Sequence, residues 1–280
     1  MEKYPHAVIV TKEIADDWGT KRPQESGAFL CRRIDALRQL CKYMASLDIE
    51  TYIPRNHPSS GKPVLTIPSS EDMIEFFEIL DNRKTDARTY RYIYAHRIMF
   101  RLYYCCGLRL SEARTLRRED VDLENLTLTI KESKGHKDRL VYLPDDSKEI
   151  MSEYIGYISE LFPLSPYVFP GQDPEKPVTG IAVDKMFRLC WAETNASRKY
   201  SKPPTVHCLR HAFVVERINQ WAKEGVDLNV MLPYLSSYLG HRSIYETFYY
   251  YHMVDSAFSI IAEKGSSTTD VIPEVTAYEE

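Results

Sequence analysis

Five side chains beyond residue 100 have the chemistry that cleavage of a phosphodiester bond requires. Arg109 and Arg210 can each bind two phosphate oxygens at once and stay charged, and Lys134, His207 and His241 can transfer protons. Such cleavage also needs a nucleophile, and activated hydroxyl groups serve that purpose in proteins. The residue types therefore indicate phosphoryl chemistry as one candidate function.

Each segment also has an ordinary structural explanation when it is taken alone. A single arginine at a helix end or a lysine in a turn is usually solvated, and a tyrosine run such as 249–251 usually packs in a core or an interface. His207 and His211 are four residues apart and could bind a metal ion from one helix face, but the glutamate of an HExxH motif is absent. No single segment decides the function.

The first arginine lies at a predicted junction between two helices. The sequence predicts a helix over 90–106, and Gly107 is expected to end it. Ser111 is expected to cap the next helix, because a serine hydroxyl can accept a backbone N–H of the first turn. Arg109 would then be held in a tight connection between the two helices.

Lys134 lies at the predicted tip of a β-hairpin. Residues 126–131 alternate between apolar and polar side chains, which is typical of a half-buried strand, and 140–143 form a second short strand candidate. The segment between them, 133–138, is polar and contains a glycine, so we expect a basic turn there. The pattern becomes helical again from about Ser147.

The N-terminal part predicts one helix over 29–47, with apolar residues at steps of three and four. A stretch rich in proline, glycine and serine, 54–63, is typical of an extended linker. Ser69 and Asp72 then form a predicted capping box before an apolar helix over 73–80. The basic residues of the first helix fit either a solvated face or a face that contacts phosphates: Arg32, Arg33, Arg38 and Lys42.

Composition and charge set limits on the class of protein. The chain has 280 residues, of which 44% are hydrophobic and 27% charged, as in soluble globular proteins. The net charge is −4, and segment 265–280 holds four acidic and no basic residues. The remaining 264 residues therefore carry equal numbers of basic and acidic residues, 36 of each. No apolar run reaches the roughly 20 residues of a membrane helix, and we expect a cytoplasmic protein with no membrane partner. Six scattered cysteines without a CxxC pair indicate neither a disulfide framework nor a zinc ribbon.

The order and spacing of the segments resemble the motifs of the tyrosine recombinase, or phage integrase, family. Residues 104–113 (Tyr-Cys-Cys-Gly-Leu-Arg-Leu-Ser-Glu-Ala) are similar to the family's first arginine motif, and 207–211 (His-Cys-Leu-Arg-His) to its HxxR motif. Segment 133–139 resembles the family's β-hairpin, in which a lysine stands five residues before an arginine. Leu-Gly-His at 239–241 with Tyr250 nine residues after the histidine resembles the closing motif. The similarity covers roughly the last two thirds of the chain.

This resemblance implies that Tyr250 attacks the scissile phosphate, forms a 3'-phosphotyrosine and releases a 5'-hydroxyl. The nine-residue step from His241 selects it over Tyr249 and Tyr251, which flank it. The bond energy is kept in the phosphotyrosine, so we expect no metal, nucleotide or other cofactor.

The resemblance also implies a role for each remaining motif residue. Glu112, three residues after the first arginine, would support the site without chemistry of its own. The arginines would stabilise the pentavalent transition state through its non-bridging oxygens. The full assignment has Arg109 and Arg210 as the clamp, Lys134 as the general acid, His207 assisting proton transfer with the tyrosine and His241 hydrogen-bonded to the phosphate.

The implied fold is mainly α with a small antiparallel β-sheet (α+β), in which a small helical N-terminal domain precedes a larger catalytic domain. Residues 1–63 would be a short or truncated helical core-DNA-binding domain with its linker, 64–264 the catalytic domain and 265–280 a disordered acidic tail. Double-stranded DNA is the expected partner, with self-assembly into a tetramer on paired sites. Segment 256–264 could dock on a neighbouring subunit or pack on its own.

The expected function is site-specific recombination, in the integration or excision of a mobile element or a related process. Three other hypotheses stay open: a DNA-binding protein of this fold that does not cleave DNA, a topoisomerase with the same tyrosine chemistry, and a metal-dependent hydrolase. The last would use the histidines at 207, 211 and 241. The compact size and the Leu-Gly-His motif favour recombination over topoisomerase activity.

Overall fold

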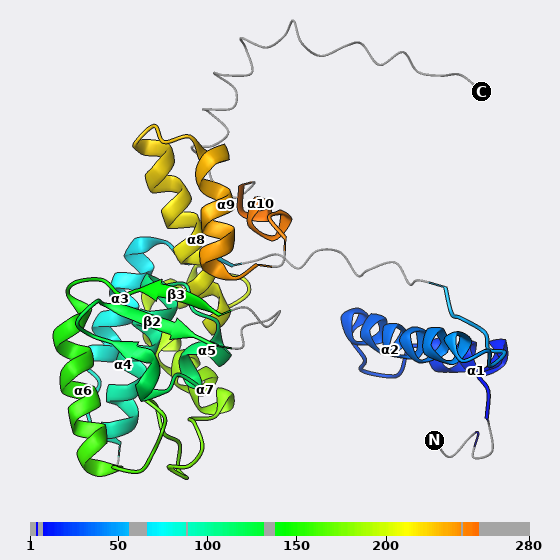
Figure 1. Cartoon of the computed structure of the whole chain (residues 1–280), viewed down its shortest axis with the longest axis horizontal. Helices are drawn as coiled ribbons and strands as arrows, with labels where there is room; N and C mark the ends of the chain where they lie inside the picture. The colour runs from blue at the N-terminus through cyan, green and yellow to red at the C-terminus, as the bar shows by residue number, and fades with distance from the viewer. Residues whose placement is uncertain are drawn as a thin grey trace, which may run out of the picture. The chain divides into compact units, whose positions relative to one another are not determined.

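The computed structural model describes residues 4, 8–55, 66–87, 89–131, 138–241 and 243–251. Contacts divide the chain into two units, Met1–Val64 and Leu65–Glu280, next to the boundary expected at 63/64. The predicted tail 265–280, the segment 256–264 and the hairpin tip lie outside the described residues. The elements of Figure 1 are α1 (Lys12–Gly19), α2 (Gly27–Ser46), α3 (Ser70–Asp81), α4 (Tyr90–Cys105), α5 (Leu110–Arg114), η1 (Arg118–Asp120), β1 (Val121–Asp122), β2 (Thr127–Ile130), β3 (Arg139–Tyr142), α6 (Ser147–Leu161), α7 (Gly180–Glu193), η2 (Asn195–Arg198), α8 (Val206–Lys223), α9 (Leu228–Leu239) and α10 (Tyr245–Tyr251).

In the described part of the first unit, helices α1 and α2 pack on each other. The helix predicted over 29–47 is α2, whereas α1 was not predicted. Arg33 fits neither of the roles considered for the basic residues, because it is only 8% exposed. Its Nε donates to Glu25 at 2.9 Å, and its guanidinium donates to the carbonyls of Trp18 and Thr20. Arg38 likewise donates to the Pro54 carbonyl. These two arginines therefore stabilise the unit internally.

The second unit is built around α4, which contacts α3, α5, α6 and α8. The rings of Phe76, Phe100 and Phe187 meet at its centre, with centroids 5.1 to 5.8 Å apart, and such aromatic contacts add to the apolar burial. The capping box predicted for α3 is confirmed, since the Ser69 hydroxyl and the Asp72 carboxylate each accept the other's backbone N–H. Among the described residues no helix is long and apolar enough to span a membrane.

The sheet confirms the expected fold class of helices with a small antiparallel sheet. Its order is β1-β2-β3, and both pairings are antiparallel. Leu128 pairs with Val141, and both are fully buried against the helices. Ile130 pairs with Arg139 where the two long strands end, so this pair closes the base of the hairpin tip. The short strand β1 was not predicted.

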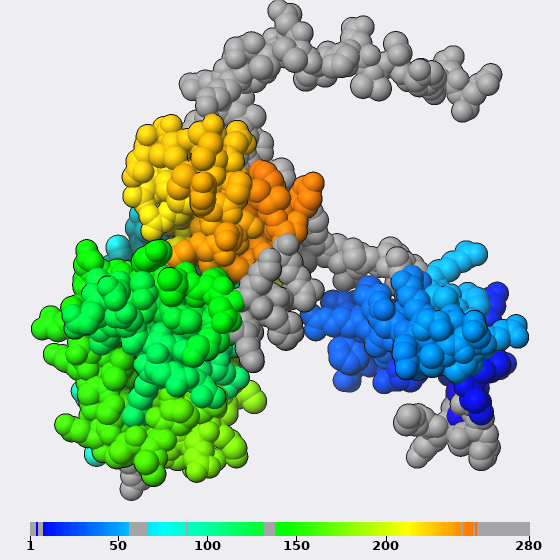
Figure 2. Space-filling view, viewed as in Figure 1, coloured from blue at the N-terminus to red at the C-terminus, as the bar shows by residue number. Residues whose placement is uncertain are grey.

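Helix α8 belongs to two hydrophobic clusters. Val206 and Leu209 in its first turn pack in the main core, whereas Val214 and Ile218 pack with α9 and α10 in a smaller cluster. Figure 2 shows α10, in orange, against the gold α8 and α9. The histidines and the arginine of the HxxR motif lie between the two clusters, in the first turns of α8.

Candidate active site

Gly107 and Arg109 form a sharp connection between α4 and α5. Gly107 has φ +65°, a left-handed conformation that favours glycine, and a Cβ there would lie 2.5 Å from the Phe213 ring. The expectation that Ser111 caps α5 is wrong, because Arg109 is the N-cap. The reason is Glu112: its carboxylate accepts the Arg109 backbone N–H at 2.8 Å, which starts the helix two residues earlier.

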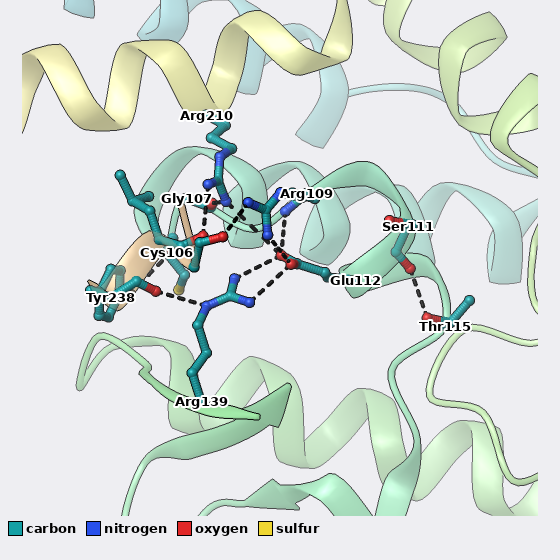
Figure 3. A network of polar contacts seen from close by, with 11 residues as sticks. Cys106, Gly107, Arg109, Ser111, Glu112, Thr115, Arg139, Arg210 and Tyr238 are labelled. Atoms are coloured by element: carbon teal, nitrogen blue, oxygen red, sulfur yellow. Dashed lines mark hydrogen bonds and ion pairs between the residues drawn. The ribbon is translucent and has the colours of Figure 1, made fainter. Parts of the chain in front are cut away.

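Three guanidinium groups share the carboxylate of Glu112 (Figure 3). Arg109 Nη1 and Arg139 Nη2 each lie 2.8 Å from a Glu112 oxygen, and Arg210 Nη1 lies 4.0 Å away. Burial by itself would raise the pKa of Glu112, but the hydrogen bonds and charges of Arg139 and Arg109 outweigh it and hold the pKa at about 2. The cluster therefore contains one negative charge, on Glu112, and three positive charges, on the arginines.

The C-terminus of α9 holds the same three arginines through its backbone. The carbonyls of residues 238, 239 and 240 accept from Arg139, Arg210 and Arg109 at 2.7, 2.8 and 2.7 Å. These carbonyls are among those that a helix end leaves without an intrahelical partner, and they lie at the negative end of the helix dipole. Gly240, with φ +64°, ends the helix in the left-handed conformation.

The histidines lie beside this cluster. Burial, followed by the charges of Arg210 and Arg109, lowers the pKa of His241 to about 4. His241 Nδ1 is 2.8 Å from the Thr247 hydroxyl of α10. The rings of His207 and His211 meet edge to face, with centroids 4.4 Å apart, and His207 is the more exposed of the two. At neutral pH His241 is therefore uncharged, although it stands among cations.

Tyr250 is 4% exposed and packs in the small cluster formed by α8, α9 and α10. Its hydroxyl is hydrogen-bonded to Nδ1 of His211, which lies one helical turn after His207, the histidine expected to assist it. Burial, followed by the charges of His207 and Arg210, lowers the pKa of His211 to about 3. Tyr250 also acts electrostatically on Arg210, so the phenol is within range of the guanidinium cluster.

The structure thus brings five of the six predicted site residues into one region, and the sixth, Lys134, lies outside the described residues. Sequence reasoning missed the parts played by Arg139 and His211. The signals were present: Arg139 follows Lys134 by five residues, and His211 stands one helical turn after His207. Within the described ranges, no group of three or more His, Cys, Asp and Glu side chains is placed to hold a metal ion.

Most of the second unit matches a known protein family. The family model described as "Phage integrase family" matches residues 72–256, about two thirds of the chain. The chain belongs to the phage integrase family. The matched region contains both arginines of the proposed clamp and Tyr250.

Relatives within the integrase family cover most of the chain at modest identity. A Sinorhizobium fredii protein described as "Putative integrase/recombinase y4rB" is 27% identical over 257 residues, 88% of this chain and 80% of that protein. A tyrosine recombinase of Pseudothermotoga lettingae is 28% identical over 228 residues, 81% of this chain and 71% of its own length. Matches to two further Sinorhizobium relatives cover only 55% and 45% of those proteins.

Solved structures show the same fold. The XerH site-specific recombinase bound to its palindromic difH substrate has a TM-score of 0.66 at 20% identity, over 95% of this chain and 76% of that one. The Tn1549 transposon integrase in complex with circular intermediate DNA has a TM-score of 0.65 at 18% identity, over 90% of this chain and 85% of that one.

Proposed function

We propose that this protein is a site-specific DNA recombinase that cleaves and rejoins strands through a 3'-phosphotyrosine on Tyr250. The observation that carries the proposal is the convergence of Arg109, Arg139 and Arg210 on one carboxylate, with the Tyr250 hydroxyl held nearby by His211. Such a cluster has more positive charge than Glu112 can neutralise, so it favours an anion such as a phosphodiester.

The clamp would act through Arg109 and Arg210. Backbone carbonyls fix both guanidinium planes before any substrate arrives, so little reorganisation is needed when charge develops on the phosphate oxygens. Arg109 also lines a cleft of about 680 Å³ together with Thr129 and Lys131 of the hairpin and the acidic residues Glu119 and Asp120. The hairpin lysine Lys134 would protonate the 5'-oxygen as it leaves.

The nucleophile would be activated by the DNA itself. A histidine with a pKa near 3 is neutral and weakly basic at pH 7, so His211 holds the Tyr250 hydroxyl without deprotonating it. Burial is the main cause of this low pKa, and a phosphate beside the cluster would offset the positive charges that lower it further. His207, which is exposed and whose ring contacts that of His211, would pass the proton on, and His241 would hydrogen-bond the phosphate.

Double-stranded DNA is the proposed partner, and the DNA-bound structures of related fold support it. Assembly into a tetramer on two paired sites is proposed with it, because exchange of strands between two duplexes requires four cleavages. Integration or excision of a mobile element is the process that we propose. The first unit, 1–64, would act as a short DNA-binding domain. No metal or cofactor is part of the proposed reaction.

The direct test uses a nicked suicide substrate that contains the target site, in which the cleaved end diffuses away and the covalent adduct accumulates. The parent protein should form a protein–DNA adduct that survives denaturation, and Tyr250→Phe should form none while its affinity for the same DNA stays within about threefold. Adduct formation by Tyr250→Phe at the parental rate would exclude the assignment of the nucleophile.

Two controls make the test specific. Tyr249→Phe removes a neighbouring phenol and should leave adduct formation intact, because the nine-residue step from His241 selects Tyr250. Addition of EDTA should leave the parental rate unchanged, whereas a metal-dependent hydrolase would lose activity and would leave no tyrosine adduct.

A further inference from the structure

Of the three arginines around Glu112, Arg139 is the second most buried, with 9% of its side chain exposed. Its Nη1 and Nη2 donate to the two oxygens of Glu112 at 2.9 and 2.8 Å, and its Nε donates to the Tyr238 carbonyl at 2.7 Å. Three of the five donors of the guanidinium are thus directed at protein acceptors in a bidentate and side-on arrangement. This geometry is that of a connector between elements.

The connection joins three separate parts of the site (Figure 3). Arg139 is the first residue of β3 and pairs with Ile130, so its backbone forms the base of the hairpin tip. Glu112, which it grips, also binds Arg109 through both the backbone N–H and Nη1 at 2.8 Å. Tyr238 lies at the end of α9, directly before the Leu-Gly-His segment. The hairpin base is therefore tied to the clamp through one shared carboxylate.

We propose that Arg139 is a positioning residue that fixes the hairpin base against the Arg109–Glu112 pair and so sets where Lys134 meets the phosphate. This inference rests on the proposed function. Lys134 precedes Arg139 by five residues, and proton transfer requires the donor within hydrogen-bond reach of the leaving oxygen, so the position of the hairpin base bears on this step. Arginine suits this position because its planar fork can bind both carboxylate oxygens while Nε donates to the carbonyl, a geometry that the compact ammonium group of lysine does not have.

The proposal predicts that loss of Arg139 damages protonation of the leaving group more than binding of the phosphate. A suicide substrate with sulfur in place of the bridging 5'-oxygen separates the two steps. A thiol has a pKa of roughly 8.5, far below that of an alcohol, so it leaves without a general acid. The proposed step is the same in both substrates: the Tyr250 oxygen forms a bond to phosphorus as the bond to the 5'-atom breaks.

Single-turnover cleavage by Arg139→Gln should fall about 100-fold on the oxygen substrate and stay within about fivefold of the parent on the sulfur substrate. Lys134→Ala should show the same pattern on the two substrates. Arg139→Lys keeps the charge, and its cleavage rate on the oxygen substrate should be about tenfold higher than that of Arg139→Gln. This variant keeps the test informative if Arg139→Gln folds poorly. Glu112→Gln should lose activity on both substrates, because Glu112 holds Arg109 directly.

Arg118→Gln provides a matched structural control. Arg118 donates to carbonyls of Ile158 and Phe162 at the end of α6, so its loss should affect both substrates equally. An equal loss on both substrates for Arg139→Gln, or no loss on either, would overturn the proposal. Failure of the parent itself to form an adduct on either substrate would instead count against the proposed function, so the two failures are distinguishable.

Discussion

At the scale of single residues, the surroundings of Glu112, His211 and His241 lower the pKa values of all three side chains. Glu112 is kept ionised by two arginines, while burial and nearby cations keep His211 and His241 neutral. A neutral His211 can share a hydrogen bond with the Tyr250 hydroxyl without competing with the arginines for a phosphate. The Tyr250 phenol is thereby held inside the hydrophobic cluster of α8, α9 and α10, and in the proposed reaction the phosphate would supply the negative charge that activates it.

This arrangement predicts a loss of stability in mild acid. The pKa of His211 is about 3 in the folded protein against 6.5 unfolded, so between these values the unfolded chain binds more protons and stability falls as the pH falls. His211 should contribute about 2 kcal/mol of this loss between pH 7 and pH 5. Urea unfolding at both pH values checks it.

A His211→Gln variant is the control for that measurement. The glutamine side chain can still accept or donate a hydrogen bond but does not titrate. Its unfolding free energy should depend on pH less steeply than that of the parent, with the remaining slope due to other buried histidines such as His96. Identical slopes for the parent and the variant would show that His211 titrates normally in the folded state.

At the scale of elements, the connection from α4 to α5 decides where the first arginine stands. Its tightness depends on Gly107, which has no Cβ to meet Phe213 and which adopts a positive φ. Alanine at this position would strain the backbone and displace the Phe213 ring on α8, the helix that also carries Arg210. The two halves of the clamp are therefore coupled through this glycine.

Gly107→Ala should lower the free energy of unfolding by about 1–3 kcal/mol and reduce cleavage more than DNA binding. Gly156→Ala is a control of opposite sign: Gly156 lies within α6 with no atom within 4 Å of a built Cβ, so alanine should raise stability by about 0.5–1 kcal/mol. Chemical denaturation of both variants gives the comparison. If Gly107→Ala left the free energy of unfolding unchanged, the turn would have to accept a Cβ without strain.

Local patterns in the sequence predicted local structure well. Alternation located the hairpin, and the Ser69–Asp72 pair located the start of α3, because each depends on neighbours within a few residues. The Ser111 cap failed because a carboxylate one residue farther on competes for the same role. The parts played by Arg139 and His211 depend on partners 27 and 39 residues away, which no local pattern specifies.

At the scale of the whole molecule, the second unit contains its own core and all the described site residues, whereas the first unit contributes the α1–α2 pair. Catalytic chemistry and a share of DNA affinity are therefore expected to separate. Phosphate contacts supply much of the affinity of DNA-binding proteins and make it depend on salt. Removal of one unit should change that dependence in a measurable way.

A chain shortened to residues 65–280 should bind target DNA at least about tenfold more weakly than the full chain, with a shallower dependence of log affinity on log salt. It should still form the Tyr250 adduct at low salt and high protein concentration, because the site lies within this unit. Fluorescence anisotropy titrations at several salt concentrations, with thermal melts to verify folding, test this. Unchanged affinity would remove the first unit from DNA binding.

The three successive carbonyls at the end of α9 have a consequence for how this protein can vary. Every chain position carries a carbonyl whatever its side chain, so the acceptors that hold Arg139 and Arg210 come from the backbone of α9, and the buried Leu239 side chain keeps that backbone in place. Selection or engineering is then free to alter the outer surface of α9, while Gly240 stays restricted by its positive φ. Libraries diversified at exposed positions of α9, such as Val230 and Tyr234, should yield active recombinases more often than libraries diversified on α5.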